Sequence, residues 1–420
     1  MKKLFILVVA IVMAFAALPA FAQDKADWAF YGSVRMWTAW EQVDSDAPPQ
    51  LTSLSPGAGI PGFQVAVSRA RAYSIGGDLQ SDGDLAWMLQ GNSRIGANVK
   101  WGNISGAFEY GHSGGWGVDS ASGNPSLRLL YGMWNFGPGQ LEIGQDYGSY
   151  FYLVSNLCGP GGQECNGIGF GSIYPGRLPM IRLIFGGLKL SLEATRTTGS
   201  FNTINIGAAN ATAQTPFLTN NVPIETDWLL PRLAASYTFN AGPGQFFIGG
   251  QYNQLKEIYS VGGVERDNTV DGWTLGAGTK LSFGPFYTNA TVQYGYNPNN
   301  VGSGPATLYP SVQLYDVTLD RNEDSKYMAA QLILGFKLTD AMTFEGGVIW
   351  QSGKVQTVAT ENSVKQDTWT YYLQMVWSPT KNFFIIPEIG VVDYDKLSTD
   401  TGDLNYGKMS WLGVKWQINF

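Results

Sequence analysis

The chain has few charged residues, little histidine or cysteine, and no long apolar run beyond its first residues. Charged residues make up 14% of the 420 positions, against roughly 25% in soluble domains. One histidine and two cysteines are too few for an ordinary zinc site. After residue 22, no stretch approaches the ~20 uninterrupted apolar residues that a membrane helix needs. These shortages argue against a soluble multidomain enzyme and against a helical membrane protein.

Glycine and aromatic residues are abundant instead. The chain contains 53 glycines and 14% aromatic residues, whereas glycine usually makes up about 7% of a sequence. A transmembrane β-barrel uses both, because aromatic residues form its interfacial girdles and small residues allow the sheet to curve. The net charge of −7 argues against nucleic acid as a partner.

Motifs for cofactors or catalysis are missing. The sequence has no Walker loop, Rossmann fingerprint or HExxH motif, so we expect neither a cofactor nor a bound metal. His112 lies beside Ser113, but adjacency alone is a poor basis for a lipase-type pair. We therefore expect that the protein is not an enzyme.

The first residues have the pattern of an export signal. Met1-Lys2-Lys3 provides a positive start, residues 4–18 a long apolar segment, and Ala20-Phe21-Ala22 a small-residue cleavage site. We expect residues 1–22 to be a cleaved signal peptide and residues 23–420 to form one exported domain. The alternative is an uncleaved N-terminal anchor helix.

The last ten residues alternate between apolar and polar side chains. One face carries Leu412, Val414, Trp416, Ile418 and Phe420, and the other carries Gly413, Lys415, Gln417 and Asn419. An exposed edge strand with such an apolar face invites aggregation, whereas closure into a barrel within lipid pairs its edge and covers its face. The ending resembles the terminal strand of bacterial outer-membrane proteins. That resemblance implies that Trp416 and Phe420 form a signal read by the barrel assembly machinery.

Similar alternating segments recur along the chain. Seven short turns separate them in alternation with eight longer polar loops, as in outer-membrane barrels with short periplasmic turns and long extracellular loops. The pattern predicts an all-β fold, a transmembrane antiparallel β-barrel of sixteen strands. Residues 65–75 also alternate, and we treat them as an excursion within the first long loop, because counting them would make the number odd. The sixteen predicted strands are 27–41, 85–101, 104–112, 126–136, 140–147, 178–185, 188–196, 228–239, 245–256, 270–283, 286–296, 327–338, 342–354, 366–377, 382–394 and 406–420.

The strand count, the long fifth connection and the terminal Phe420 are similar to the general porins of Gram-negative outer membranes. The resemblance is one of architecture and covers essentially all of residues 23–420. Residues 89–96 and 129–136 are also similar to segments of porin-like proteins from sulfate- and metal-reducing bacteria. These resemblances imply a water-filled channel for passive diffusion of small hydrophilic solutes and ions. They also imply a homotrimer that contacts outer-membrane lipid, lipopolysaccharide and the barrel assembly machinery.

In general porins the third loop folds into the barrel and narrows it. The corresponding connection here is about residues 148–177, and it contains Cys158 and Cys165. Two closely spaced cysteines in an exported protein are expected to form a disulfide. The disulfide could hold the shape of a loop inside the lumen or merely tie an extracellular loop. General porins carry an acidic cluster on this loop, whereas this chain has only Glu164 there.

The alternation also predicts which charged side chains face the lumen. Opposed charges across a constriction orient dipolar solutes, and a net sign biases ion selectivity. Four inward arginines favour a basic wall opposite the third loop, although inter-strand salt bridges, such as Arg94 with Glu109, are the alternative for any one of them. The predicted constriction residues are Arg35, Arg94, Arg128, Arg182, Glu109, Glu142 and Glu164.

Two rival classes of protein are compatible with the sequence. The same barrel could form a substrate-selective, anion-preferring channel or a surface adhesin. A soluble exported β-solenoid or lectin could also contain many short alternating strands.

Overall fold

The structure is a computed structural model of the chain. It describes residues 26–43, 83–112, 125–160, 165–194, 200–204, 221–228, 230–261, 264–301, 314–316, 321–356, 363–399, 402–405 and 407–420. The expected signal peptide, residues 65–75 and Glu164 lie outside the described residues. Among the described residues, no helix is long and apolar enough to cross a membrane.

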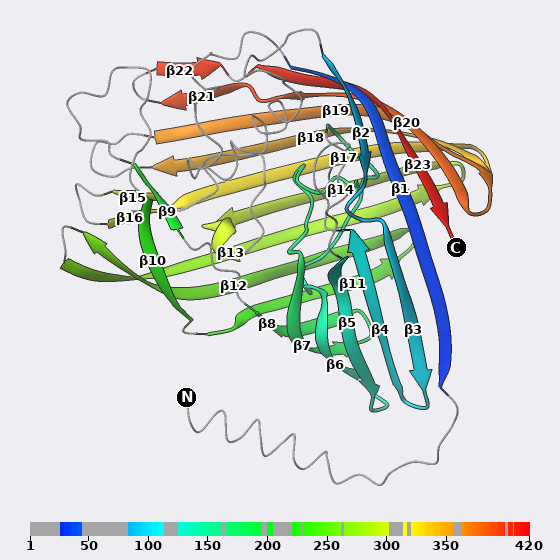
Figure 1. The fold of residues 1–420 in the computed structure, drawn as a ribbon, viewed down its shortest axis with the longest axis horizontal. Helices are drawn as coiled ribbons and strands as arrows, with labels where there is room; N and C mark the ends of the chain where they lie inside the picture. Colours follow the sequence, from blue (N-terminus) through cyan, green and yellow to red (C-terminus); the bar gives the residue numbers. More distant parts are fainter. Residues whose placement is uncertain are drawn as a thin grey trace.

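The described strands form a closed antiparallel barrel with a wall of sixteen strands (Figure 1). The barrel closes where β1 pairs with β23, from Ser33 opposite Asn419 to Val43 opposite Met409. The predicted fold class and strand count are confirmed, and this closed barrel is neither a β-solenoid nor a lectin sandwich. The wall strands are β1 (Asp27–Val43), β2 (Asp84–Leu89) continued by β3 (Arg94–Trp101), β4 (Ile104–His112), β5 (Pro125–Asn135), β6 (Gln140–Tyr147), β7 (Arg177–Phe185), β8 (Leu188–Glu193), β11 (Arg232–Ala241), β12 (Gly244–Val261), β13 (Val264–Phe283), β14 (Phe286–Tyr296), β17 (Ser325–Thr339), β18 (Met342–Gln356), β19 (Ser363–Thr380), β20 (Phe383–Asp393) and β23 (Lys408–Asn419).

The two ends of the barrel differ in their connections. Short turns join β3 to β4 and β7 to β8, and Gly102 and Gly186 adopt φ values of 57° and 58° there, a region that glycine enters without steric cost. The short strands gather at the opposite end, at the left of Figure 1. These strands are β9 (Ser200–Ile204), β10 (Asn221–Trp228), β15 (Leu314–Asp316), β16 (Arg321–Glu323), β21 (Lys396–Thr399) and β22 (Gly402–Asn405). A 3₁₀ turn, η2 (Pro298–Val301), follows β14.

The second wall strand departs from the sequence prediction because it is interrupted. Met36 of β1 faces Leu89, and Ser33 faces Arg94. Two residues of β1 therefore lie opposite four residues of its partner, 90–93. The interruption is held by hydrogen bonds from the Gln90 amide to the Arg35 carbonyl and from the Ser93 amide to the Gln90 carbonyl. The Gly-Asn-Ser sequence suits this turn, and the insertion brings polar groups to the inner wall.

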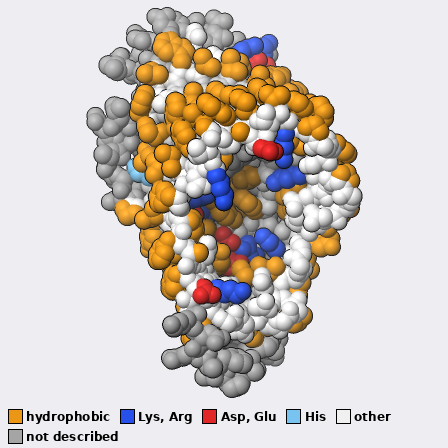
Figure 2. Space-filling view, turned by 90° about the vertical axis from the view of Figure 1, so that its right-hand side faces the viewer, with side chains coloured by type: hydrophobic (Ala, Val, Ile, Leu, Met, Phe, Trp, Pro, Cys, Tyr) orange, Lys and Arg blue, Asp and Glu red, His pale blue; other side chains and the backbone are white. Residues whose placement is uncertain are grey.

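Apolar side chains cover the outside of the wall, and polar side chains line its inside. Val292 and Leu412 are more than half exposed, while their neighbours Gln293 and Gly413 are buried within the barrel. Figure 2 shows the same division, with hydrophobic side chains around the outside and Lys, Arg, Asp and Glu in the central hollow. An outer surface of this kind is stable in lipid, and a polar lumen is stable in water.

Candidate functional site

The connection between β6 and β7, residues 148–176, is called loop 3 here. Its described residues contact inward-facing side chains on the far wall of the barrel. The Tyr150 hydroxyl reaches the Gln293 side chain of β14 at 3.5 Å, and the Ser155 hydroxyl lies 2.7 Å from that of Tyr372 in β19. Because loop 3 begins and ends on the β6–β7 side, these contacts carry it across the lumen.

Two glycines of β13 make room for loop 3. A Cβ atom at Gly276 would lie 2.4 Å from the Tyr150 hydroxyl oxygen, and one at Gly278 would lie 2.6 Å from the Tyr152 ring. Tyr152 stacks on Phe247 of β12 with ring centroids 4.8 Å apart. Burial raises the pKa of Tyr152 to about 12, so its hydroxyl stays neutral. Loop 3 is thus seated in a groove that only glycine leaves open.

Cys158 and Cys165 form a disulfide, as the sequence predicts. Both cysteines are nearly inaccessible to solvent. The Gln90 side-chain amide, at the interruption between β2 and β3, donates a 3.0 Å hydrogen bond to the Cys165 sulfur. The disulfide therefore lies against the inner wall of the barrel.

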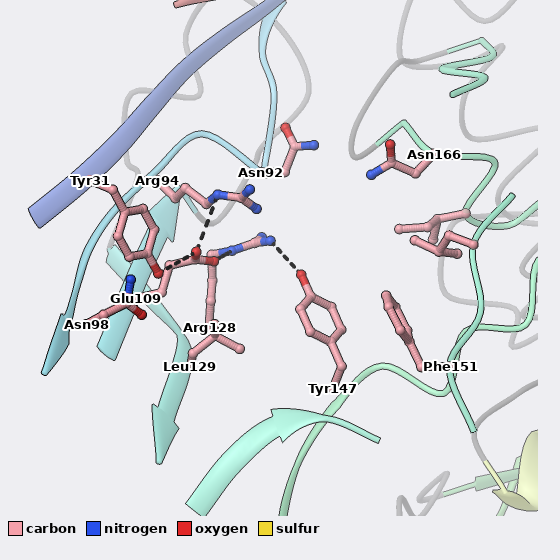
Figure 3. A pocket seen from close by; sticks show the side chains of 12 residues that line it. Tyr31, Asn92, Arg94, Asn98, Glu109, Arg128, Leu129, Tyr147, Phe151 and Asn166 are labelled. Atoms are coloured by element: carbon pink, nitrogen blue, oxygen red, sulfur yellow. Dashed lines mark hydrogen bonds and ion pairs between the residues drawn. The ribbon is translucent and has the colours of Figure 1, made fainter. Parts of the chain in front are cut away.

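A cavity of about 450 Å³ lies between loop 3 and the wall strands β1 and β3–β5. In Figure 3, Arg94, Arg128 and Glu109 stand on the wall side, and Phe151 and Asn166 stand across from them on loop 3. The wall side is polar and charged, while much of the loop side is apolar. The lining residues are Tyr31, Asn92, Arg94, Asn98, Glu109, Arg128, Leu129, Tyr147, Phe151, Leu153, Asn166 and Ile168.

Two guanidinium groups share one carboxylate at this cavity. Arg128 lies 2.6 Å from Glu109 and Arg94 lies 3.3 Å from it. Arg128 and Glu109 are buried, whereas about a quarter of the Arg94 side chain is exposed. Arg35 lies nearby, and its Nε donates to the Ser33 hydroxyl at 2.8 Å. Within the described ranges Arg35 forms no ion pair. Two arginines at the cavity, Arg94 and Arg128, share one carboxylate, and the charge of Arg35 adds to this positive excess.

Two further predicted constriction residues, Arg182 and Glu142, are not among the residues that line the cavity. Arg182 is 2.6 Å from both Glu142 and Asp146, and it also donates to the Tyr147 carbonyl at 2.8 Å. These residues form a compact ion-pair group at the root of loop 3. The structure therefore brings Arg94, Glu109 and Arg128 together with Arg35 close by, and it separates Arg182 and Glu142 from them.

Sequence reasoning missed four charged groups of the inner wall as site candidates. Glu345 of β18, Glu388 of β20, Lys415 of β23 and Arg232 of β11 are all buried. The alternation of apolar and polar residues along each strand could have identified these four side chains as inward-facing, because each lies between outward-facing neighbours. The missing information was the path of loop 3, which contacts both Glu345 and Glu388.

The C-terminal residue takes part in closing the barrel. Backbone hydrogen bonds of 2.8 and 3.1 Å join Phe420 to Gly32, and the Phe420 side chain is 65% exposed on the outer wall. The Trp416 indole N–H donates to the Thr38 hydroxyl at 3.1 Å. Both aromatic side chains thus lie at the seam between the first and last strands.

No family model matches the chain, and no curated protein matches it significantly. Solved structures do match its fold. The outer-membrane channel DcaP of Acinetobacter baumannii is 17% identical, with a TM-score of 0.59 over 96% of this chain and 100% of that one. OmpF of Salmonella typhi is 10% identical, with a TM-score of 0.51 over 93% and 97%. OprB of Pseudomonas putida is 11% identical, with a TM-score of 0.51 over 94% of both chains.

These similarities define the class of the fold. The chain has the sixteen-stranded barrel of Gram-negative outer-membrane porins. Together with the apolar outer wall, this fold makes the protein an integral outer-membrane β-barrel.

Proposed function

We propose that the protein is an outer-membrane porin through which small hydrophilic solutes and ions diffuse passively. The observation that carries this proposal is the cavity between loop 3 and the charged wall formed by β1 and β3–β5, inside a barrel whose outer wall is apolar. A sixteen-stranded barrel is wide enough for an aqueous channel. Loop 3 occupies part of that width, so the cavity marks the constriction in this proposal.

The charges beside the cavity favour passage of anions. Arg94 and Arg128 share the single carboxylate of Glu109, and Arg35 adds another positive charge nearby. Fixed charges of one sign raise the local concentration of ions of the other sign. We therefore infer an anion preference. Glu164 lies outside the described residues, and its predicted part in the constriction stays a prediction.

The finer features follow from the resemblance to general porins. We infer a homotrimer in contact with outer-membrane lipid and lipopolysaccharide, assembled after cleavage of residues 1–22. Trp416 and Phe420, at the barrel seam, would be recognised by the assembly machinery. Ion transport then needs no cofactor and no catalytic group. The likeness of residues 89–96 and 129–136 to porins of sulfate- and metal-reducing bacteria stays a prediction.

Reconstitution of the purified protein in planar lipid bilayers tests the function. We expect stepwise ohmic conductance, and a reversal potential of the sign for anion preference in asymmetric KCl. A barrel that inserts but does not conduct would refute the channel and leave the surface-adhesin alternative. Conductance with cation preference would keep the channel and refute the assignment of selectivity.

A further inference from the structure

The cavity beside loop 3 has two chemically different sides. Its wall side carries the guanidinium groups of Arg94 and Arg128, and its loop side carries Phe151, Leu153 and Ile168. These three apolar side chains are partly exposed, although they face a lumen that holds water in the proposed channel. Apolar surface left in contact with water is unfavourable, and an apolar patch beside polar groups is typical of a ligand-binding surface.

The first arm of loop 3 points alternate side chains in opposite directions, as an extended chain does. Tyr150, Tyr152 and Val154 are buried, and Tyr150 reaches β14 while Tyr152 stacks on β12. Phe151 and Leu153 alternate with them and line the cavity instead. The contacts with β12 and β14 thus do not use Phe151 and Leu153, whose apolar surfaces can meet a solute.

Tyr147 and Phe151 belong to an aromatic cluster that is held in place from the wall. Their ring centroids are 4.7 Å apart, and the Tyr174 ring lies 6.2 and 6.0 Å from the two. Arg128 donates a 3.2 Å hydrogen bond to the Tyr147 hydroxyl, and the Arg177 guanidinium lies 5.7 Å from the centre of the Tyr147 ring. Aromatic rings that are already fixed can receive another apolar group at little cost in conformational entropy.

Arg94 is the cation that a solute in the cavity can reach. Arg128 directs its guanidinium to Glu109, to the Gly91 carbonyl and to the Tyr147 hydroxyl. Arg94 contacts Glu109 through its Nε at 3.3 Å and is partly exposed. In Figure 3 its terminal nitrogens extend from the wall towards the side of loop 3. The paired N–H groups of a guanidinium match the two oxygens of a carboxylate.

The charges and the size of the cavity suit a small monoanion. Its charged lining residues are Arg94, Arg128 and Glu109, which leave one positive charge in excess. The volume of about 450 Å³ lies within the roughly 300–1,000 Å³ that is usual for small-molecule sites. An inorganic anion would use only the wall side, whereas an anion with an apolar body would also cover the apolar side chains of loop 3.

We propose that this cavity is a binding site for monocarboxylates with an apolar body. The carboxylate binds Arg94, and the apolar body lies against Phe151, Leu153 and Ile168. The inference rests on the proposed channel function for the passage of the solute through the barrel. Binding itself needs only the cavity and can be measured without conduction.

Benzoate, acetate and benzyl alcohol are matched probes of the site. Acetate lacks the apolar ring of benzoate, and benzyl alcohol lacks its charge. Ligand-observed NMR titrations of the folded barrel in detergent, referred to protein-free micelles, measure the three affinities. We expect benzoate to bind about tenfold more tightly than either of the other two, because it alone uses both sides of the cavity. Equal affinities for benzoate and acetate would overturn the proposal.

Variants separate the two sides of the cavity. Leu153→Asn replaces an apolar side chain by a polar one of similar size, and it should weaken benzoate binding about fivefold with a smaller effect on acetate. Arg94→Gln should weaken the binding of both acids about tenfold. Met133→Asn is the control, because Met133 lines a different cavity, and its affinities should equal those of the wild type. Wild-type affinity for benzoate in Leu153→Asn would overturn the role of the apolar side.

Ile168→Asn serves if Leu153→Asn does not fold, because Ile168 lines the same side of the cavity. Folded barrels are selected by heat-modifiable migration on gels. We expect the ratio of benzoate to acetate affinity to fall in folded Ile168→Asn, and an unchanged ratio would count against the proposal.

Currents through the wild-type barrel in KCl give a second readout. We expect added benzoate to interrupt the current, and acetate at the same concentration to interrupt it much less. Equal interruption by the two acids would overturn a site for apolar carboxylates on the passage. A wild-type barrel that does not conduct would refute the proposed channel, while the NMR affinities would still decide whether the cavity binds benzoate.

Discussion

Replacing Arg94 should change the ion selectivity by an amount that can be worked out from its position. The Arg94 side chain lines the cavity and is about a quarter exposed, while buried Arg128 keeps the shorter contact to Glu109. The charge of Arg94 is therefore the one that a passing ion meets most directly. Arg94→Gln removes one positive charge, and Arg94→Glu reverses it.

The magnitude follows from Coulomb's law. A unit charge about 5 Å from a passing ion contributes about 0.8 kcal/mol in water, so charge reversal contributes about 1.7 kcal/mol. Salt screens this energy, because the Debye length is about 30 Å at 0.01 M and about 3 Å at 1 M. The charge-reversal energy of Arg94→Glu therefore falls to about 1.4 kcal/mol at 0.01 M and about 0.3 kcal/mol at 1 M. Since 1.4 kcal/mol is about tenfold, anion permeability should drop about tenfold at low salt and less than twofold at 1 M.

Reversal potentials in asymmetric KCl, measured at low and high salt, provide the assay. Lys408→Gln is a control, because Lys408 is more than half exposed and pairs with Asp393 away from the cavity. We expect the order wild type, Arg94→Gln, Arg94→Glu in falling anion preference, and no effect of Lys408→Gln. An effect that is independent of salt, or equal for Arg94 and Lys408, would refute the electrostatic reasoning.

Three further changes test other parts of the structure. Gly278→Val should displace the Tyr152 side chain from its position against β13 and destabilise the contact with loop 3 by about 1–3 kcal/mol. The current noise should then rise. Noise equal to that of the wild type would show that loop 3 does not pack against Gly278. Cys158→Ser breaks the disulfide, which closes a loop with a sequence separation of 7 residues. It should lower the stability of the loop by about 2 kcal/mol and alter the conductance or its noise. Unchanged single-channel currents would contradict a disulfide inside the passage. Deletion of Phe420, or Phe420→Ser, should lower the amount of heat-modifiable barrel in outer membranes several-fold and leave the single-channel conductance unchanged. Normal abundance of the variant would show that Phe420 contacts lipid but is not needed for assembly.

The wall of the barrel could be predicted from the sequence because its two faces meet different solvents. Lipid outside and water inside impose a period of two, and Leu412 to Asn419 show that period without interruption. The interruption at residues 90–93 was missed, because its two-residue insertion preserves the alternation. Arg94 and Leu89 keep their faces on either side of it.

The charged pairs of the site were only partly predictable. The pairing of Arg94 with Glu109 followed from neighbouring strands, but Arg128 is the closer partner of Glu109. Arg128 stands at a register shift, where Glu109 faces Leu129 and Tyr110 faces Leu127. Simple counting in twos does not detect such a bulge.

The contacts of loop 3 with the far wall could not be read from the sequence. Glu388 lies 230 positions from Cys158, and Glu345 lies 189 positions from Asn156. Their inward orientation follows from alternation, yet their partners depend on the irregular path of loop 3. Paths of that kind are set by tertiary contacts rather than by any local pattern.

Chemical block of single cysteines tests most directly whether the conducting path runs between loop 3 and β1–β5. Both native cysteines are in the disulfide, so an introduced thiol is the one free thiol available. We expect a bulky, membrane-impermeant thiol reagent to reduce the current through Asn98→Cys, whose position lines the cavity, and to leave Leu130→Cys, on the outer wall, unchanged. Full current after complete modification of Asn98→Cys would contradict a passage at this cavity.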